Sequence, residues 1–263
     1  MFKRLFAAIV FGVLTISSAQ AADRILPLGD SITGETRAWR LPYCDQDRAA
    51  CDAGTWHFVG LQVEQYPCSN TSCLPNDQLH HAGYSGYTIA AIRDVAGVEA
   101  SVGQPTRVMV LAGANDIAWW YGTPIPTLAQ QYLELVQAIW DGAPNAVIYV
   151  HPVLPVSSML IQTGAGGYVD RATLPPQLNQ ALIDTLPWGP QLIMTGNTLT
   201  TADLRDGVHP TEAGYVKLAA DYHKALVGDV TPPPPPPPQD DLPAICDRPI
   251  GQRLRLCHPS LVP

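Results

Sequence analysis

The chain has 263 residues, 14% of them charged, and a formal net charge of −8. An acidic chain has no electrostatic attraction to nucleic acid or anionic lipid, so its charge argues against both as partners. The length suits one domain with its own hydrophobic core, and we expect a monomer that is not stably inserted in a membrane.

Residues 1–21 predict a secretory signal peptide. The basic start MFKR precedes the apolar stretch LFAAIVFGVLTI, and the AQA that follows has the small-residue pattern of a cleavage site. The apolar stretch is short for a membrane span, so an uncleaved anchor is the less favoured alternative. We therefore expect an exported protein, either secreted or periplasmic.

Residues 22–228 predict a single α/β domain. Short runs that are apolar on both faces suit strands of a buried parallel sheet, and they cover residues 24–29, 56–62, 107–113, 146–153 and 191–196. Candidate helices cover residues 89–99, 126–141, 175–185 and 211–226. This alternation predicts a three-layer α/β/α sandwich around a central, mainly parallel five-stranded sheet. The polar segment 34–80 predicts a long excursion around the second strand.

The six cysteines predict disulfides rather than a metal site. Export makes disulfides permissible, and the chain has no Cys-x-x-Cys spacing of the kind that binds zinc. The spacing suggests three local pairs, although connectivity cannot be deduced from sequence: Cys44 with Cys51, Cys68 with Cys73, and Cys246 with Cys257. We expect neither a metal nor a cofactor.

The C-terminal residues predict a linker and a short tail. Residues 229–241 contain seven consecutive prolines, which favour an extended polyproline II rod. Residues 242–263 are too few to form their own core and predict a disulfide-looped tail. This tail either docks on the domain or a cell surface, or forms a disordered end.

Polar residues follow three of the predicted strands where each strand ends. Ser31 follows the first run, Asn115 follows the third, and Asp206 and His209 follow the fifth. Parallel strands end at the same edge of a sheet, where such folds bind ligands. A serine hydroxyl needs an adjacent base to act as a nucleophile, and a carboxylate orients an imidazole for that task. The pattern therefore predicts acyl transfer.

Four stretches at these positions, GDSIT, GYSGYT, GAND and DGVHP, resemble in order the blocks of the SGNH (GDSL) hydrolase superfamily. The resemblance implies the flavodoxin-like SGNH hydrolase fold and a serine esterase. It implies Ser31 as nucleophile and His209 with Asp206 as its proton relay. The oxyanion donors would be the backbone N–H groups of Ser31 and Gly86 and the side chain of Asn115. The Gly-x-Ser-x-Gly elbow of ordinary α/β-hydrolases is absent from the sequence.

Three stretches, HHAGYSGYTI, LPLGDSIT and FVGLQ, are similar to carbohydrate esterase family three, the acetyl xylan esterases. This resemblance implies an O-acetyl ester on a polysaccharide as substrate. The second block begins with His81 where many superfamily members have asparagine. His81 is thus either a structural hydrogen-bonding residue or a group near the site.

Further residues are candidates for substrate binding. Trp119, Trp120 and Tyr121 follow the oxyanion asparagine, and their rings would stack on sugars, shape an acyl pocket or pack in the core. Asp30 is a candidate too, although a structural role is the stronger expectation. The glycine-containing loop 157–175 is expected to border the cleft.

The leading hypothesis is an exported serine esterase that removes small acyl groups, above all acetyl, from carbohydrate such as xylan. A second hypothesis keeps the chemistry but has a lipid ester, thioester or lysophospholipid as substrate, which the apolar AWWYG segment would suit. A third is a non-catalytic binding protein on the same scaffold, which would have no need for Ser31, Asn115 and His209 together.

Overall fold

A computed structural model describes residues 23–35, 56–63, 80–119 and 122–228 of the chain. The predicted signal peptide, linker and tail, all six cysteines, Trp120 and Tyr121 lie outside these residues. Those predictions therefore stay predictions, and the fold below concerns the described part of the predicted α/β domain.

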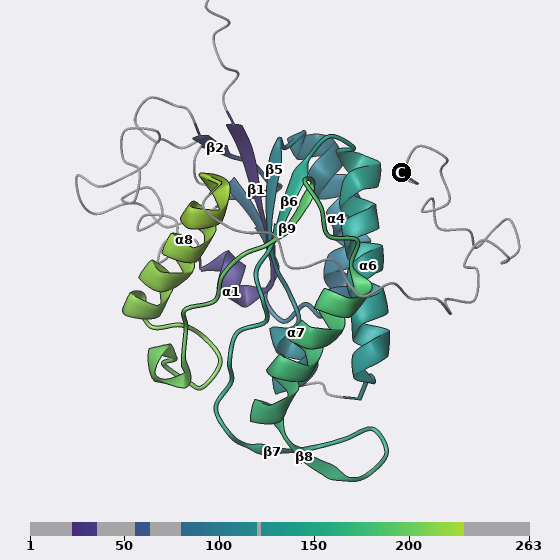
Figure 1. The fold of residues 1–263 in the computed structure, drawn as a ribbon, viewed down its shortest axis with the longest axis vertical. Helices are drawn as coiled ribbons and strands as arrows, with labels where there is room; N and C mark the ends of the chain where they lie inside the picture. The colour runs from purple at the N-terminus through teal and green to yellow at the C-terminus, as the bar shows by residue number, and fades with distance from the viewer. Residues whose placement is uncertain (1–22, 36–55, 64–79, 120–121, 229–263) are drawn as a thin grey trace, which may run out of the picture.

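A mainly parallel sheet forms the centre of the molecule (Figure 1). Its five principal strands run parallel in the order β4–β1–β5–β6–β9. They are β4 (His80–Gly83), β1 (Asp23–Gly29), β5 (Arg107–Leu111), β6 (Val147–Val150) and β9 (Leu192–Met194). Two short strands complete the sheet: β2 (Trp56–Phe58) runs parallel to the start of β1, and β3 (Gln62–Val63) runs antiparallel to β4.

Helices cover both faces of the sheet, so the predicted three-layer α/β class is confirmed (Figure 1). One apolar core lies under α4 (Ile89–Gly103), α6 (Ile125–Gly142) and α7 (Leu174–Thr185). The other lies under α1 (Ser31–Gly34) and α8 (Glu212–Leu226). The four predicted helices correspond to α4, α6, α7 and α8, because each has an apolar stripe that the sheet buries.

The segment around the second predicted strand differs from the sequence expectation. The run 56–62 is divided into β2 and β3 at Gly60, which adopts φ +149°. Only glycine fits there, since a Cβ would lie 2.2 Å from the carbonyl oxygen of His81. The neighbour of β1 near the site is instead β4, in a stretch that the sequence suggested only as an entry to a helix. His81 lies in this strand, 7% exposed.

The predicted loop 157–175 contains structure of its own. Strands β7 (Leu160–Gln162) and β8 (Tyr168–Asp170) pair as an antiparallel hairpin that projects at the lower end of the molecule in Figure 1. A 3₁₀ turn, η2 (Arg171–Thr173), follows β8 directly and leads into α7. None of the helices formed by the described residues has the length and apolar character needed to cross a membrane.

Candidate active site

Ser31 lies where β1 ends and α1 begins, at the carboxyl edge of the sheet. The turn is tight: a Cβ on Gly29 would lie 2.2 Å from the carbonyl oxygen of Leu111, on the adjacent strand β5. Asp30 caps α1, because its Oδ1 accepts a hydrogen bond of 2.9 Å from the backbone N–H of Ile32. Strand, tight turn and cap together place the Ser31 hydroxyl at the first position of the helix.

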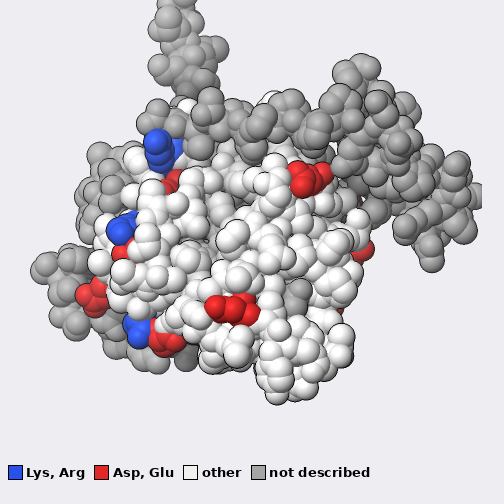
Figure 2. All heavy atoms as spheres, turned by 60° about the horizontal axis from the view of Figure 1, so that its bottom comes forward, with Lys and Arg blue, Asp and Glu red and all other residues white. Residues whose placement is uncertain are grey.

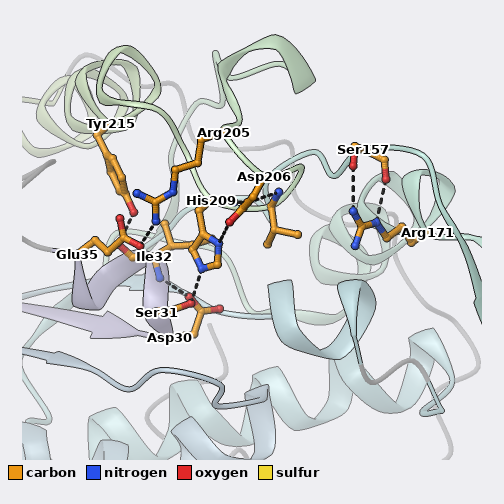
Figure 3. Close-up of polar contacts among 11 residues, drawn as sticks. Asp30, Ser31, Ile32, Glu35, Ser157, Arg171, Arg205, Asp206, His209 and Tyr215 are labelled. Atoms are coloured by element: carbon orange, nitrogen blue, oxygen red, sulfur yellow. Dashed lines mark hydrogen bonds and ion pairs between the residues drawn. The ribbon is translucent and has the colours of Figure 1, made fainter.

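Ser31, His209 and Asp206 form a continuous chain of hydrogen bonds (Figure 3). Ser31 Oγ lies 2.8 Å from His209 Nε2, and His209 Nδ1 lies 2.8 Å from Asp206 Oδ2. A carboxylate on Nδ1 fixes the proton there, which leaves Nε2 to accept the hydroxyl proton of the serine. The structure thus brings together the three residues on which the acyl-transfer prediction depends.

The loop that carries Asp206 and His209 is held by its own backbone. Asp206 Oδ1 accepts hydrogen bonds from the N–H groups of Val208 (3.0 Å) and His209 (2.8 Å). Partial burial by itself raises the pKa of Asp206. The backbone N–H groups of His209 and Val208, followed by the His209 ring, outweigh this and lower the pKa to about 2. Asp206 therefore faces the imidazole as a carboxylate.

Asn115 and Gly86 follow the two strands that flank β1. Asn115 lies in α5 (Ala114–Ala118), directly after β5, and its Nδ2 donates a 2.9 Å hydrogen bond to the carbonyl of Tyr87. The second hydrogen of this amide has no acceptor among the described residues. Gly86 has φ +79° in the turn after β4, and no atom of the described residues lies within 4 Å of the position that a Cβ would take. The strand order β4–β1–β5 therefore places the other two predicted oxyanion donors on either side of Ser31.

Three neighbouring polar residues have structural contacts. Asp116 Oδ2 accepts a 2.9 Å bond from the backbone N–H of Ile89 at the start of α4, and burial raises its pKa to about 6. His81 Nδ1 accepts a 3.0 Å bond from the backbone N–H of Gly83. Asp30 is 1% exposed, and burial raises its pKa to about 7. This burial favours the structural role of Asp30 over the substrate-binding one.

Trp119 follows α5 as its C-cap residue and is 51% exposed. The guanidinium of Arg171 lies 5.3 Å from the centre of its ring, within the range of a cation–π contact. An exposed ring fixed in this way is available to a ligand, so Trp119 stays a candidate for substrate binding. Its two predicted companions lie outside the described residues.

Arg205 and Arg171 lie near the candidate catalytic residues, although neither was a predicted site residue (Figure 3). Arg205 forms an ion pair with Glu35, which follows α1. Arg171 is buried and donates two hydrogen bonds to Ser157. The position of Arg205 next to Asp206 is one weak indication in the sequence that it lies near the site. Nothing in the sequence indicates this for Arg171.

Charge is sparse on the face at which the strands end. Figure 2 turns the lower end of Figure 1 forward, and most of the described surface in view belongs to uncharged side chains. The Lys and Arg of the described residues appear toward one side of this view. Where the described residues form it, this face presents no basic patch to an anionic ligand.

Comparison with known proteins identifies the family. Residues 28–217 match the family model described as GDSL-like lipase/acylhydrolase. The chain belongs to this family. It is thus a carboxylic ester hydrolase with an α/β fold, as the four sequence blocks suggested. No curated protein matches the sequence.

Solved structures of esterases share the fold of this acylhydrolase. The structure of an acetyl esterase mutant with acetate ion has a TM-score of 0.62 and 21% identity, and the match covers 78% of this chain and 96% of that one. A carbohydrate esterase family 3 structure from Talaromyces cellulolyticus has a TM-score of 0.62 and 22% identity, over 80% and 100% of the chains. The Clostridium thermocellum family 3 carbohydrate esterase has a TM-score of 0.54 and 22% identity, over 79% and 100%.

Proposed function

We propose that this acylhydrolase is a secreted serine esterase that hydrolyses small acyl esters, above all O-acetyl groups, on a polysaccharide such as xylan. The observation that carries the proposal is the hydrogen-bonded chain Ser31–His209–Asp206, with 2.8 Å at each of its two links. A serine alone is a weak nucleophile, whereas a serine with this proton acceptor is activated.

The reaction follows from these contacts. Ser31 Oγ attacks the ester carbonyl while His209 Nε2 takes its proton, and the charged Asp206 stabilises the imidazolium that forms. The backbone N–H groups of Ser31 and Gly86 and the second amide hydrogen of Asn115 donate to the oxyanion. His209 then protonates the leaving alkoxide, which departs and leaves an acyl-enzyme. Water, deprotonated by His209, releases the carboxylic acid and restores the serine.

Several features support acetylated carbohydrate as the substrate. The similar structures include an acetyl esterase with acetate ion and two carbohydrate esterases of family 3. The sparsely charged face around the strand ends suits a neutral polymer better than an anionic one (Figure 2). Trp119, half-exposed, offers an aromatic surface of the kind on which sugar rings stack.

The proposed domain organisation fits an extracellular substrate. A signal peptide over residues 1–21 would export the chain, and a Pro-rich linker would separate the hydrolase domain from the tail at 242–263. Polymeric xylan does not cross a membrane, so an enzyme that acts on it must meet it outside the cytoplasm. Mass analysis of the mature protein would test the cleavage site after Ala21 and the number of disulfides.

A lipid ester is the second candidate substrate. On the β7–β8 hairpin, Leu160 is 70% exposed and Tyr168 is 71% exposed. Exposed apolar side chains at the edge of a site would suit a long acyl chain or a lipid surface. Chain-length preference separates the two candidates.

The test is hydrolysis of p-nitrophenyl acetate, butyrate and octanoate, with acetate release from acetylated xylan. We expect the acetate ester to be the best of the three and xylan to release acetate. Ser31→Ala should abolish both, while Ser101→Ala, on the exposed side of α4, should leave them unchanged. Preference for octanoate would favour the lipid ester. Equal rates for wild type and Ser31→Ala would disprove the serine mechanism.

A further inference from the structure

Arg171 is a buried cation near the proposed catalytic residues, and the mechanism above does not use it. Its side chain is 3% exposed. No carboxylate among the described residues forms an ion pair with it. The adjacent Asp170 directs its oxygens elsewhere, to Ser158 Oγ and to the backbone N–H groups of Met159 and Ala172. Because burial of a charge without an acidic partner costs free energy, the neutral groups that this guanidinium binds indicate its role.

The guanidinium holds Ser157 with two nitrogens (Figure 3). Nε donates to the Ser157 carbonyl and Nη2 donates to Ser157 Oγ, both at 2.9 Å. This planar fork fixes the backbone and the side chain of one residue at the same time. A lysine carries its three donors on a single nitrogen and cannot reproduce this planar fork.

Ser157 in turn holds the loop between Asp206 and His209. Its backbone N–H donates a 2.9 Å hydrogen bond to the carbonyl of Gly207. Gly207 has φ +84°, and a Cβ there would lie 2.1 Å from Ser157 Oγ and 3.1 Å from Arg171 Nη2. The loop therefore packs directly against Ser157 and Arg171, with no room for a larger residue.

The same guanidinium contacts the oxyanion side of the site. Nη1 donates a longer bond of 3.4 Å to the carbonyl of Ala118, the last residue of α5, and the group lies over the ring of Trp119. Asn115 is in α5. Arg171 is thus bonded to the helix that carries the oxyanion amide and, through Ser157, to the loop that carries the proton relay.

We propose that Arg171 is a positioning residue for ester hydrolysis, which couples α5 to the Asp206–His209 loop through Ser157. This inference rests on the proposed function. Arg171 does not reach the reacting atoms; it keeps His209 Nε2 at hydrogen-bonding distance from Ser31 Oγ while the oxyanion donors stay in place. A misplacement of about 1 Å in such an arrangement can cost about 100-fold in rate.

The primary variant is Arg171→Lys, which keeps the charge and removes the fork. Active sites are counted by labelling Ser31 with a fluorophosphonate, so that misfolded protein does not enter the rate. We expect kcat per labelled site on p-nitrophenyl acetate to fall about 10- to 100-fold, with KM changed less than about threefold. Arg93→Met, which removes the surface ion pair with Glu134, is the matched control and should keep the wild-type kcat.

A second measurement, by NMR, does not depend on catalytic turnover. The proton between His209 Nδ1 and Asp206 should give a downfield ¹H NMR resonance in the wild type, which we expect to shift or broaden in Arg171→Lys. Ser157→Ala removes one of the two acceptors and keeps both backbone groups, so it should lower kcat per labelled site about two- to tenfold and shift the same resonance. This milder variant carries the test if Arg171→Lys does not fold.

A purely structural role would lower stability and the number of labelled sites only. The proposal requires both the fall in kcat per site and the change in the resonance, so a wild-type value of either overturns it. Failure of the proposed function is a separate outcome, in which wild type and Ser31→Ala have equal rates. In that case the resonance alone decides, and an unchanged resonance in Arg171→Lys overturns the positioning role.

Discussion

Two histidine–aspartate pairs lie in the described domain, and their surroundings differ. In the open pair, His209 Nδ1 lies 2.8 Å from Asp206 Oδ2, with side chains 20% and 48% exposed. In the closed pair, His151 Nε2 lies 3.6 Å from Asp221 Oδ2, with side chains 0% and 6% exposed. The same two residue types thus occur in one fold in two very different settings.

The partners of each ring explain what the pairs can do. His209 has a carboxylate on one nitrogen and the Ser31 hydroxyl on the other. His151 instead has Nδ1 bonded to the carbonyl of Pro152 at 2.7 Å. Asp221 accepts bonds from the N–H (2.8 Å) and the hydroxyl (3.0 Å) of Thr198. A proton relay needs a hydroxyl and an open side for the substrate, and only the open pair has both.

The largest effect is expected where the open pair is broken. His209→Ala removes the proposed proton acceptor and should lower kcat/KM on p-nitrophenyl acetate by about 10⁴-fold or more, as loss of the base does in other serine hydrolases. The comparison variant is His151→Asn, whose kcat per labelled site should equal that of the wild type. A loss in His209→Ala no larger than in His151→Asn would contradict the assignment of the base.

The second largest effect is expected when a proposed oxyanion donor near the open pair is removed. The closed pair has no such donor beside it among the described residues. Asn115→Ala removes one proposed oxyanion donor and should lower kcat about 10²- to 10³-fold with little change in KM, because such an interaction strengthens in the transition state. Asn179→Ala is the control, since this amide bonds only the backbone of Val153 in the described structure, at 2.7 and 3.0 Å. Equal kcat values for the two variants would remove Asn115 from the site.

The open pair and its serine could be predicted from the sequence because each residue belongs to a short, recognisable stretch of it. Asp206 and His209 are three residues apart, so one turn of backbone suffices to join them. Ser31 comes at the end of a clear apolar strand. The closed pair joins residues far apart in the chain, and nothing in the local pattern of either residue indicates the other. Only the packed fold places α8 against the end of β6.

The lack of a local sequence pattern also explains the other differences between the predicted and the observed structure. Strand β4 has two histidines where an apolar alternation would be expected, so periodicity did not reveal it. Arg171 and Ser157 meet because a hairpin intervenes between them, and Arg205 meets Glu35 across most of the domain. Helices were predicted more accurately than strands, since their long apolar stripes carry more residues of signal.

Asp30 is a third carboxyl in the domain, and its buried surroundings allow the effect of burial on a carboxyl pKa to be measured. Burial raises the pKa of Asp30 from 3.8 to about 7. A carboxyl whose pKa is higher in the folded state stabilises that state fully below pH 3.8, and this contribution is lost as the pH rises through about 7. Asp30→Asn keeps an acceptor for the N–H of Ile32 and cannot ionise.

We therefore expect the free energy of unfolding of Asp30→Asn, relative to wild type, to rise between about pH 4 and pH 7. The gain should reach at most about 4 kcal/mol, counting about 1.4 kcal/mol for each pKa unit, and should level off above about pH 7. Urea unfolding at several pH values measures it. A difference between the two proteins that does not vary with pH would show that Asp30 is already charged in the folded state.

The smallest effect is expected in the closed pair itself. His151→Asn keeps a donor for the carbonyl of Pro152 and loses the ring that packs against Tyr222, with centroids 5.4 Å apart. The free energy of unfolding should fall by about 1–3 kcal/mol, while kcat per labelled site should not change. Urea unfolding and active-site labelling measure the two quantities on one sample. A tenfold loss of kcat at unchanged stability would instead assign the buried pair to the reaction, because packing alone acts on the folded fraction and not on the rate of each folded molecule.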